Sequence, residues 1–333
     1  MRSINPRIRL HALSFAAVTA AALSAGISPA WADTFPSKPI TFVVPFPPGG
    51  PTDAMARTLA VALTENLGQS VVVENKAGAG GNIGAEVVAR SKPDGYTIMF
   101  GTSGPLAINK SLYKKISYDP ASSFAPVIRV GHLPNILVVN PKVQANTVQE
   151  LIAQDKAKPA SLNFASSGNG ASSHLAGVLF NQKAETQLQH VPYKGTGPAL
   201  NDLLAGQVEM TFTDILTAMP YIQSGKLKAI GVATEKRSQA MPQIPTIAEQ
   251  GLPGYDVSVF FGVVAPAGTP DERIATLNQA FRKALDSEKV RTTFKAQGLE
   301  AAPDHSPQAL AKFITEEVAK WKQVVDASGA QLD

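Results

Sequence analysis

Residues 40–67 read ITFVVPFPPGGPTDAMARTLAVALTENL, and this stretch contains the pattern that decides the fold. Its first residues, 40–45, are a short apolar run of the kind that forms a buried strand. A loop rich in proline and glycine follows, after which apolar residues recur every four positions from Met55 to Leu67. That spacing places them on one face of a helix beginning near Thr52. The stretch therefore predicts a strand, a tight loop and an amphipathic helix in succession.

The same alternation of short apolar runs and amphipathic stretches continues along the chain, as is typical of α/β proteins. Residues 269–272 read TPDE, a capping box with proline at the first helical position, which predicts the start of a helix. A final amphipathic helix is expected to end at Gly329. Further strands are expected at residues 70–74, 96–101, 136–140, 162–166, 208–213, 227–233 and 257–264.

A length of 333 residues favours two lobes of ordinary size. Because no long linker separates them, the chain is expected to cross between the lobes near residues 130–135 and again near 252–255, where prolines interrupt the pattern. The two C-terminal helices have no strand after them and are expected to cover an existing sheet. We predict an α/β fold in which residues 33–134 together with 255–333 form lobe 1 and residues 135–254 form lobe 2. Each lobe is expected to be a mixed sheet flanked by helices.

The N-terminus has the features of a secretory signal peptide. Three arginines and no acid precede an apolar run at 13–27, and the pattern Ala-Trp-Ala ends at Ala32. The alternative, a transmembrane anchor, requires about 20 apolar residues, and this run is shorter. We therefore predict that residues 1–32 are a signal peptide for the Sec pathway. Since the chain has no cysteine to carry a lipid, the mature protein is expected to be free in the periplasm.

Composition excludes several classes of function. Without the three arginines of the signal peptide, 27 of the 30 Lys and Arg residues remain, against 26 Asp and Glu residues, so the charges nearly balance. No basic cluster with interleaved aromatic residues is present, so no nucleic-acid partner is expected. The absence of cysteine removes thiol nucleophiles and thiolate metal sites. His132, His174, His190 and His305 have no metal-ligand spacing, and no G-x-S-x-G elbow occurs. We predict no catalytic residues, no metal and no cofactor.

Two glycine-rich loops, each between a strand and a helix, are suited to hold an anion. They span residues 45–53 and 166–174. A helix N-terminus presents unpaired N–H groups and about half a positive charge, and glycine lets the backbone approach a ligand closely. The alternative is that both are tight loops with ordinary capping residues, but the presence of one in each expected lobe favours a ligand site. The candidate ligand-binding residues are Phe46, Gly49, Gly50, Thr52, Asp53, Ser167, Gly168, Asn169, Gly170, His174 and Asp214.

Two of these candidates have alternative roles. His174 is placed just inside the helix after the second loop, where it either orients the loop by hydrogen bonding or only packs. Asp214 ends an expected strand, and the carboxyl ends of strands face the ligand crevice in α/β lobes. Its carboxylate either accepts from a ligand hydroxyl or amino group, or caps the following helix.

A third glycine cluster, residues 78–84 with the sequence GAGGNIG, leaves an enzyme alternative open. It follows an expected strand and precedes a helix, as the dinucleotide fingerprint does. The spacing misses G-x-G-x-x-G because Ile83 stands at the third position, and no acid follows the next strand to hold a ribose. An exported NAD(P)-binding enzyme of Rossmann type is therefore the alternative to a binding protein.

Several ordered motifs in this sequence resemble the Bug family, the receptors of tripartite tricarboxylate transporters. The resemblance covers essentially the whole mature chain. The motifs are PFPPGGPTD at 45–53, ENKAGAGGNIG at 74–84, PDGYT at 93–97, HVPYKG at 190–195, LLAGQV at 203–208 and APAGTP at 265–270.

The resemblance implies a Venus-flytrap fold, with two α/β lobes and a cleft between them. It also implies that the two glycine-rich loops capture a carboxylate, partly through backbone groups and bridging water. The expected partners are the membrane permease subunits of such a transporter, with the receptor itself a monomer, and some members act instead as sensors for a signalling partner. Three positions depart from the family pattern: Ala171 replaces serine, Phe260 replaces tryptophan, and the acid Asp214 follows Phe212 one residue late.

The ligand itself is predicted from the chemistry of the loops. Neither loop contains lysine or arginine, so one carboxylate is expected to sit on backbone N–H groups at 49–52 and 167–170. Phe46, Tyr193 and Phe260 are expected to make the rest of the cleft apolar. We therefore expect a dicarboxylate, aliphatic or aromatic, rather than an amino acid.

Overall fold

The strand, loop and helix expected at residues 40–67 are present as β1 (Ile40–Val44) and α2 (Pro51–Leu67). They belong to a computed structural model that describes residues 35–333, of which Lys38–Asp333 form one compact unit. The predicted signal peptide, residues 1–32, lies outside the described residues. Within the described part of the chain, no helix is long and apolar enough to cross a membrane.

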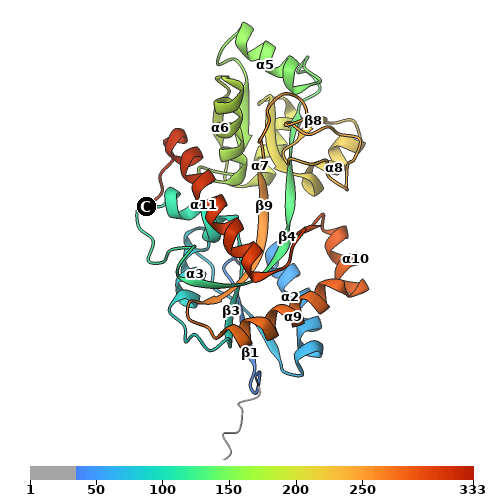
Figure 1. The fold of residues 1–333 in the computed structure, drawn as a ribbon. Helices are drawn as coiled ribbons and strands as arrows, with labels where there is room; N and C mark the ends of the chain where they lie inside the picture. The colour runs from blue at the N-terminus through green and yellow to red at the C-terminus, as the bar shows by residue number, and fades with distance from the viewer. Residues whose placement is uncertain (1–34) are drawn as a thin grey trace, which may run out of the picture. The chain divides into compact units, whose positions relative to one another are not determined.

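The elements alternate as an α/β protein requires (Figure 1). The further strands are β2 (Val71–Asn75), β3 (Thr97–Thr102), β4 (Phe124–Val139), β5 (Asn163–Ser166), β6 (Gln189–Pro192), β7 (Met210–Asp214), β8 (Lys228–Val232), β9 (Ser258–Pro266) and β10 (Glu300–Ala301). The further helices are α3 (Asn82–Ala89), α4 (Asn109–Leu112), α5 (Val148–Ala157), α6 (Ser172–Ala184), α7 (Thr196–Ala205), α8 (Ile215–Gln223), α9 (Asp271–Asp286), α10 (Glu288–Ala296) and α11 (Pro307–Ser328), with a 3₁₀ turn η1 (Ala79–Gly81) and a π-helical turn η2 (Gly104–Ile108).

The strands form one mixed sheet in the order β2-β1-β3-β9-β4-β7-β5-β6, with β8 and β10 also paired to β4. At one end, β1 runs parallel to β2 and β3; at the other, β5 runs parallel to β6 and β7. In the middle, β9 and β7 both run antiparallel to β4. The parallel pairs require crossover connections, which the helices supply.

Strand β4 is longer than the sequence indicates. A strand was expected only from residue 136, but β4 begins at Phe124 and passes through Pro134 without a break. Pro126 is accommodated at a register shift between β4 and β9, where a missing backbone donor is tolerated. The strand pairs with β9 as far as Pro134 and with β7 from Asn135 onward.

The C-terminal helices also differ in detail from their prediction. The capping box is absent, because Thr269 donates its hydroxyl to the Pro266 carbonyl (2.7 Å) and Pro270 precedes the first helical residue of α9. Helix α10, begun by Ser287 as a side-chain cap, was not predicted. Helix α11 ends at Ser328, and Gly329 follows it in the left-handed conformation, so the helix ends where expected.

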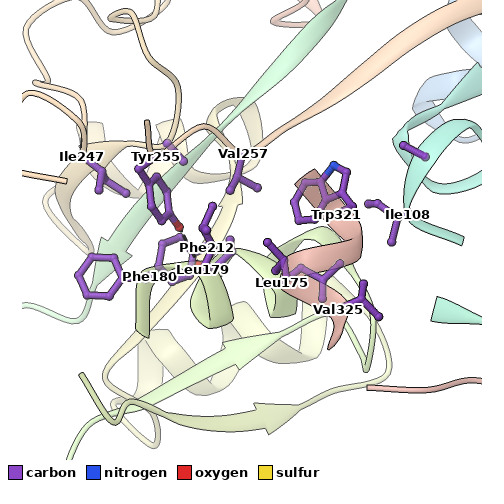
Figure 2. Packing of buried hydrophobic residues seen from close by; sticks show 14 of the residues in the cluster. Ile108, Leu175, Leu179, Phe180, Phe212, Ile247, Tyr255, Val257, Trp321 and Val325 are labelled. Carbon is purple, nitrogen blue, oxygen red and sulfur yellow. Dashed lines mark hydrogen bonds between the residues drawn. The ribbon is translucent and has the colours of Figure 1, made fainter. Parts of the chain in front are cut away.

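Buried apolar residues hold the sheet and helices together; they include two large clusters and also Phe42, Phe100 and Phe281, whose rings pack β1, β3 and α9 against one another. The larger includes Trp321 and Val325 of α11, which lie beside Leu175 of α6 and Ile108 of η2 (Figure 2). The indole N–H of Trp321 donates to Glu317 at 2.8 Å, so this buried polar atom has a partner. The smaller cluster lies within residues 136–241, around β4, β8, α7 and α8.

A glycine in α6 provides a test of how tightly this helix packs on the sheet. A Cβ atom at Gly177 would lie 2.2 Å from the ring of Phe164 on β5. We expect Gly177→Ala to lower the free energy of unfolding by about 1–3 kcal/mol, because the buried ring must move. In contrast, Gly197→Ala in α7 has no atom within 4 Å of the new methyl group and should be neutral or stabilising by up to about 1 kcal/mol. Urea unfolding of the two variants and the parent measures the difference, and equal stabilities would contradict the packing described here.

Candidate functional site

An open cavity with a volume of about 460 Å³ lies at the starts of α2, α6, α7 and α8. Residues from both predicted lobes line this cavity. The lining residues are Gly49, Gly50, Pro51, Ala54, Leu133, Asn135, Ser167, Ser172, Ser173, Thr196, Phe212, Thr213, Asp214, Leu216, Thr217, Val259 and Gln297. No lysine or arginine among residues 35–333 lines it.

Three of these helices begin without a side-chain cap. The N-cap residues of α2, α6 and α7 are Gly50, Ala171 and Gly195, and none of them offers a capping hydrogen bond. The first N–H groups of a helix have no acceptor within the helix and carry a partial positive charge. The starts of these three helices are therefore electropositive through backbone dipoles, without help from side-chain cations.

Helix α8 is the exception, because Asp214 caps it. One carboxylate oxygen accepts from the Thr217 backbone N–H at 2.8 Å and the other from the Thr217 hydroxyl at 2.6 Å. Of the two roles proposed for Asp214, the structure contains the capping one. The residue also lines the cavity, and its pairing opposite Asn135 of β4 fixes its position.

The first glycine-rich loop is held in shape by Asp53. This buried carboxylate accepts from the Gly49 N–H (3.0 Å), from Arg57 (2.9 Å) and from the Asn75 amide (2.9 Å). The hydrogen bond from Arg57 lowers the pKa of Asp53 to about 2, so the carboxylate stays charged. Asp53 therefore positions the loop whose end, at Gly50, reaches the cavity, while Thr52 is half-buried in the first turn of α2.

The second loop is fixed by its own side chains in the same way. The N–H groups of Ser167, Gly168 and Gly170 donate to the side chains of Ser173 (3.0 Å), Ser166 (3.1 Å) and His174 (3.1 Å), respectively. Several backbone donors that the sequence suggested for a carboxylate, including Gly49, are thus engaged inside their loops. The donors left for a ligand are those of the uncapped first turns.

Some of the candidate residues lie around a neighbouring cavity of about 340 Å³. Phe46, Gly168, Asn169 and Gly170 line it, and Ser167, Ser172 and Val259 are shared by the two cavities. Phe260, expected in the cleft, is instead fully buried with its ring edge-on to Phe313. The hydroxyl of Tyr193 donates to Asp202 at 2.7 Å.

The glycine cluster at 78–84 has a packing role in this fold. A Cβ atom at Gly84 would lie 2.8 Å from the backbone of Pro45, so only glycine lets α3 approach the end of β1. Asn82 accepts from the Tyr118 hydroxyl (2.9 Å) and the Asn109 amide (2.7 Å). Within the part of the chain that the structure describes, no group of three or more His, Asp or Glu residues is arranged to hold a metal ion.

Two lining residues were missed by the sequence reasoning. Asn135 is 2% exposed, and its Nδ2 has no hydrogen-bond partner among the described residues. Gln297, which ends α10, has a buried Oε1 that is also without a partner among them. Neither belongs to a glycine-rich loop, and the one signal for Asn135 is a polar residue directly before an apolar run at an expected crossing.

His174 and His190 form a stacked pair beneath the second loop. Their ring centroids are 3.8 Å apart, and His190 Nε2 lies 2.6 Å from the Ser166 hydroxyl. Because His174 Nδ1 accepts from the Gly170 N–H, this ring must be neutral to hold the loop. Burial, together with the neighbouring His174, lowers the pKa of His190 to about 4, and burial also lowers the pKa of His174.

The histidine pair predicts a pH dependence of stability. As the pH falls below the ordinary histidine value of 6.5, the unfolded chain takes up protons while folded His190 does not until about pH 4. The free energy of unfolding should therefore be unaffected by this group above pH 6.5 and decrease between pH 6.5 and 4. In His190→Gln, which keeps a hydrogen-bonding group but does not titrate, the decrease should be shallower. Urea unfolding across this range tests it, and identical slopes for the two proteins would contradict it.

Comparison with known proteins identifies the family. The model of the tripartite tricarboxylate transporter family receptor matches residues 55–330. Protein BugT of Bordetella pertussis is 43% identical over 312 residues, which cover 93% of this chain and 95% of that protein.

Solved structures agree with this match. R. palustris Rpa4515, solved with adipate, has a TM-score of 0.74 and 37% identity over 90% of this chain and 100% of that one. MatC (Rpa3494) from Rhodopseudomonas palustris, with bound malate, has a TM-score of 0.72 and 36% identity over 87% of this chain and 100% of that one. The likeness confirms the predicted α/β fold of a solute-binding protein. The chain therefore belongs to the tripartite tricarboxylate transporter receptor family, the Bug family that its motifs resemble.

Proposed function

We propose that this protein is a periplasmic receptor that holds a small carboxylate in the cavity at the starts of α2, α6 and α7. The observation that carries the proposal is the convergence of three uncapped helix N-termini on a cavity without lysine or arginine among its described lining residues. Such an arrangement attracts an anion and fixes its orientation through directed N–H groups. A phosphate-rich ligand would call for side-chain cations, which this lining does not supply.

The ligand class is proposed from the relatives and from the charge of the site. Adipate and malate, the ligands of the two related structures, are both dicarboxylates. Separate uncapped helices offer more than one place for negative charge. We therefore favour a dicarboxylate over an amino acid.

The predicted site residues divide into two roles in this proposal. Gly50 and Ser167 line the cavity and offer a backbone N–H and a hydroxyl, respectively, to the ligand or to bridging water. Asn169 lines only the neighbouring cavity and Thr52 lines neither, so these two would act through bridging water, and Gly49, Gly168 and Gly170 shape the loops. Phe46 bounds the neighbouring cavity, and Asp53, His174 and Asp214 hold the two loops and the start of α8 in place by the hydrogen bonds described above.

We also propose that the protein is exported, that it is divided into two lobes and that it works with a membrane permease. Cleavage after residue 32 would release the mature chain into the periplasm. Residues 33–134 with 255–333 and residues 135–254 would act as the two lobes, which the change of pairing partner along β4 supports. The receptor would act as a monomer, bind without catalysis and deliver its ligand to the permease subunits of a tripartite tricarboxylate transporter.

A thermal-shift screen tests the ligand class. Small aliphatic and aromatic dicarboxylates, tricarboxylates, amino acids and NAD are added to the purified mature protein. A cognate dicarboxylate at one hundred times its Kd should raise the free energy of unfolding by about 2.7 kcal/mol, because only the folded chain binds it. Stabilisation by NAD, or chemical conversion of the bound acid, would contradict a receptor without catalysis.

A change at the start of α2 tests the mechanism of capture. Gly50 has extended backbone angles (φ −80°, ψ 171°), and a Cβ atom there meets nothing closer than 3.9 Å, so a side chain fits. Both Gly50→Asp and Gly50→Asn should cap the helix and preserve or raise stability. The aspartate places a negative charge where the ligand carboxylate is proposed to sit, so calorimetry should give binding at least about tenfold weaker in Gly50→Asp than in Gly50→Asn. Equal affinities would rule out α2 as an anion-binding terminus.

A further inference from the structure

We propose that Asn135 and Gln297 determine specificity by recognising a hydroxyl group on the carbon chain of the bound carboxylate. This inference rests on the proposed carboxylate receptor function and adds a second recognition point to the same cavity. It is carried by two residues that line one cavity, each of which has a buried amide atom without a partner among the described residues.

The backbone of Asn135 is held in place where the residue lines the cavity. It lies on β4 where the strand changes partners, with Pro134 paired to Ser258 and Asn135 paired to Asp214. Its carbonyl accepts from the Ala233 N–H at 2.8 Å, which fixes the backbone. Leu133, two residues earlier on the same face of the strand, also lines the cavity.

The unpaired amide of Asn135 is expected to lower the free energy of unfolding. Asn135 is only 2% exposed, yet its Nδ2 has no hydrogen-bond partner among the described residues. A buried N–H without an acceptor loses its hydrogen bonds to water and gains nothing in return. An oxygen atom of the ligand would restore the missing bond.

Gln297 is held against the same cavity by the turn that ends α10. Its backbone N–H donates to the carbonyls of Thr293 and Phe294. A Cβ atom on the next residue, Gly298, would lie 2.6 Å from Leu216, so the turn sits directly on α8 beside the cavity. The buried Oε1 of Gln297 is an acceptor without a partner, and the Nδ2 of Asn135, on the lining of the same cavity, is a donor without one.

A hydroxyl group satisfies both amides, because it accepts one hydrogen bond and donates another. A methylene group at the same position leaves both amides unpaired. An ammonium group only donates, so it could pair with the Oε1 of Gln297 but would leave the Nδ2 of Asn135 without an acceptor. The cavity should therefore prefer a hydroxy-acid to the unsubstituted acid and to the amino acid of the same skeleton.

The test compares succinate, malate and aspartate by calorimetry, with the glutarate and adipate series and their 2-hydroxy and 2-amino derivatives added if a longer chain binds better. The parent protein should bind the hydroxy-acid about tenfold more tightly than the unsubstituted acid, the value of one buried hydrogen bond. Asn135→Leu should reduce this ratio toward one while still binding the unsubstituted acid, and Gln297→Leu should reduce it as well.

A matched control separates recognition from stability. Gln154 on α5 also has a buried Oε1 without a partner among the described residues, but it does not line the cavity. Gln154→Leu should therefore leave the hydroxy-acid preference unchanged. Asn135→Leu should unfold no more easily than the parent, because it removes an unpaired polar group.

The outcomes distinguish this inference from the function on which it rests. If the parent binds none of these acids, the carboxylate receptor function itself is overturned. If it binds them but the ratio is the same in the parent and in Asn135→Leu, or if the amino acid binds as tightly as the hydroxy-acid, the receptor function stands and the hydroxyl recognition is wrong.

Discussion

The structure depends on the backbone pairing of β4, a strand that two different sets of strands share. Up to Pro134 it is bonded to β9, and from Asn135 it is bonded to β7 and β8. A strand in an antiparallel ladder has its side chains alternate between faces, so the position of the change decides which residues meet the cavity. Leu133 and Asn135, on either side of it, both do. Because β7 lies in register with β4, the same pairing brings Asp214 and the start of α8 to that point.

The electrostatics of the site follow from where capping residues are present and absent. An aspartate caps α8 and offsets the partial charge of that helix within its first turn. Gly50, Ala171 and Gly195 leave α2, α6 and α7 without such an oxygen. Side chains that would serve as caps elsewhere are used to shape the loops: Asp53 binds the Gly49 N–H and Ser173 binds the Ser167 N–H. The loops are therefore rigid before a ligand arrives, which reduces the ordering cost of binding.

Sequence patterns predicted those features that local periodicity and loop chemistry determine. The start of α2, the glycine-rich loops and the position of Asp214 at a strand end all depend on neighbouring residues, and all are present. The first half of β4 was missed because Pro126, Arg129 and Pro134 disrupt its alternation, and only its pairing with β9 makes it a strand. Asn135 and Gln297 were missed for a similar reason. Nothing near them in sequence marks a site, since their role follows from being brought to the cavity by β4 and by the turn after α10.

Three uncapped helix starts and two residues with unpaired buried amide atoms, Asn135 and Gln297, lie at one cavity. Each leaves a polar group without the partner that folded proteins ordinarily supply. The rest of the fold can offset this cost, because a large apolar cluster around Trp321, Phe180 and Phe212 packs α6 and α11 against the sheet. At the two buried amides, a ligand that supplies the missing partner gains the full value of a bond for which the protein has already lost its water. In the binding mode proposed above, the uncapped helix starts would therefore attract the charge of the ligand, and the unpaired amides would select among ligands of the same charge.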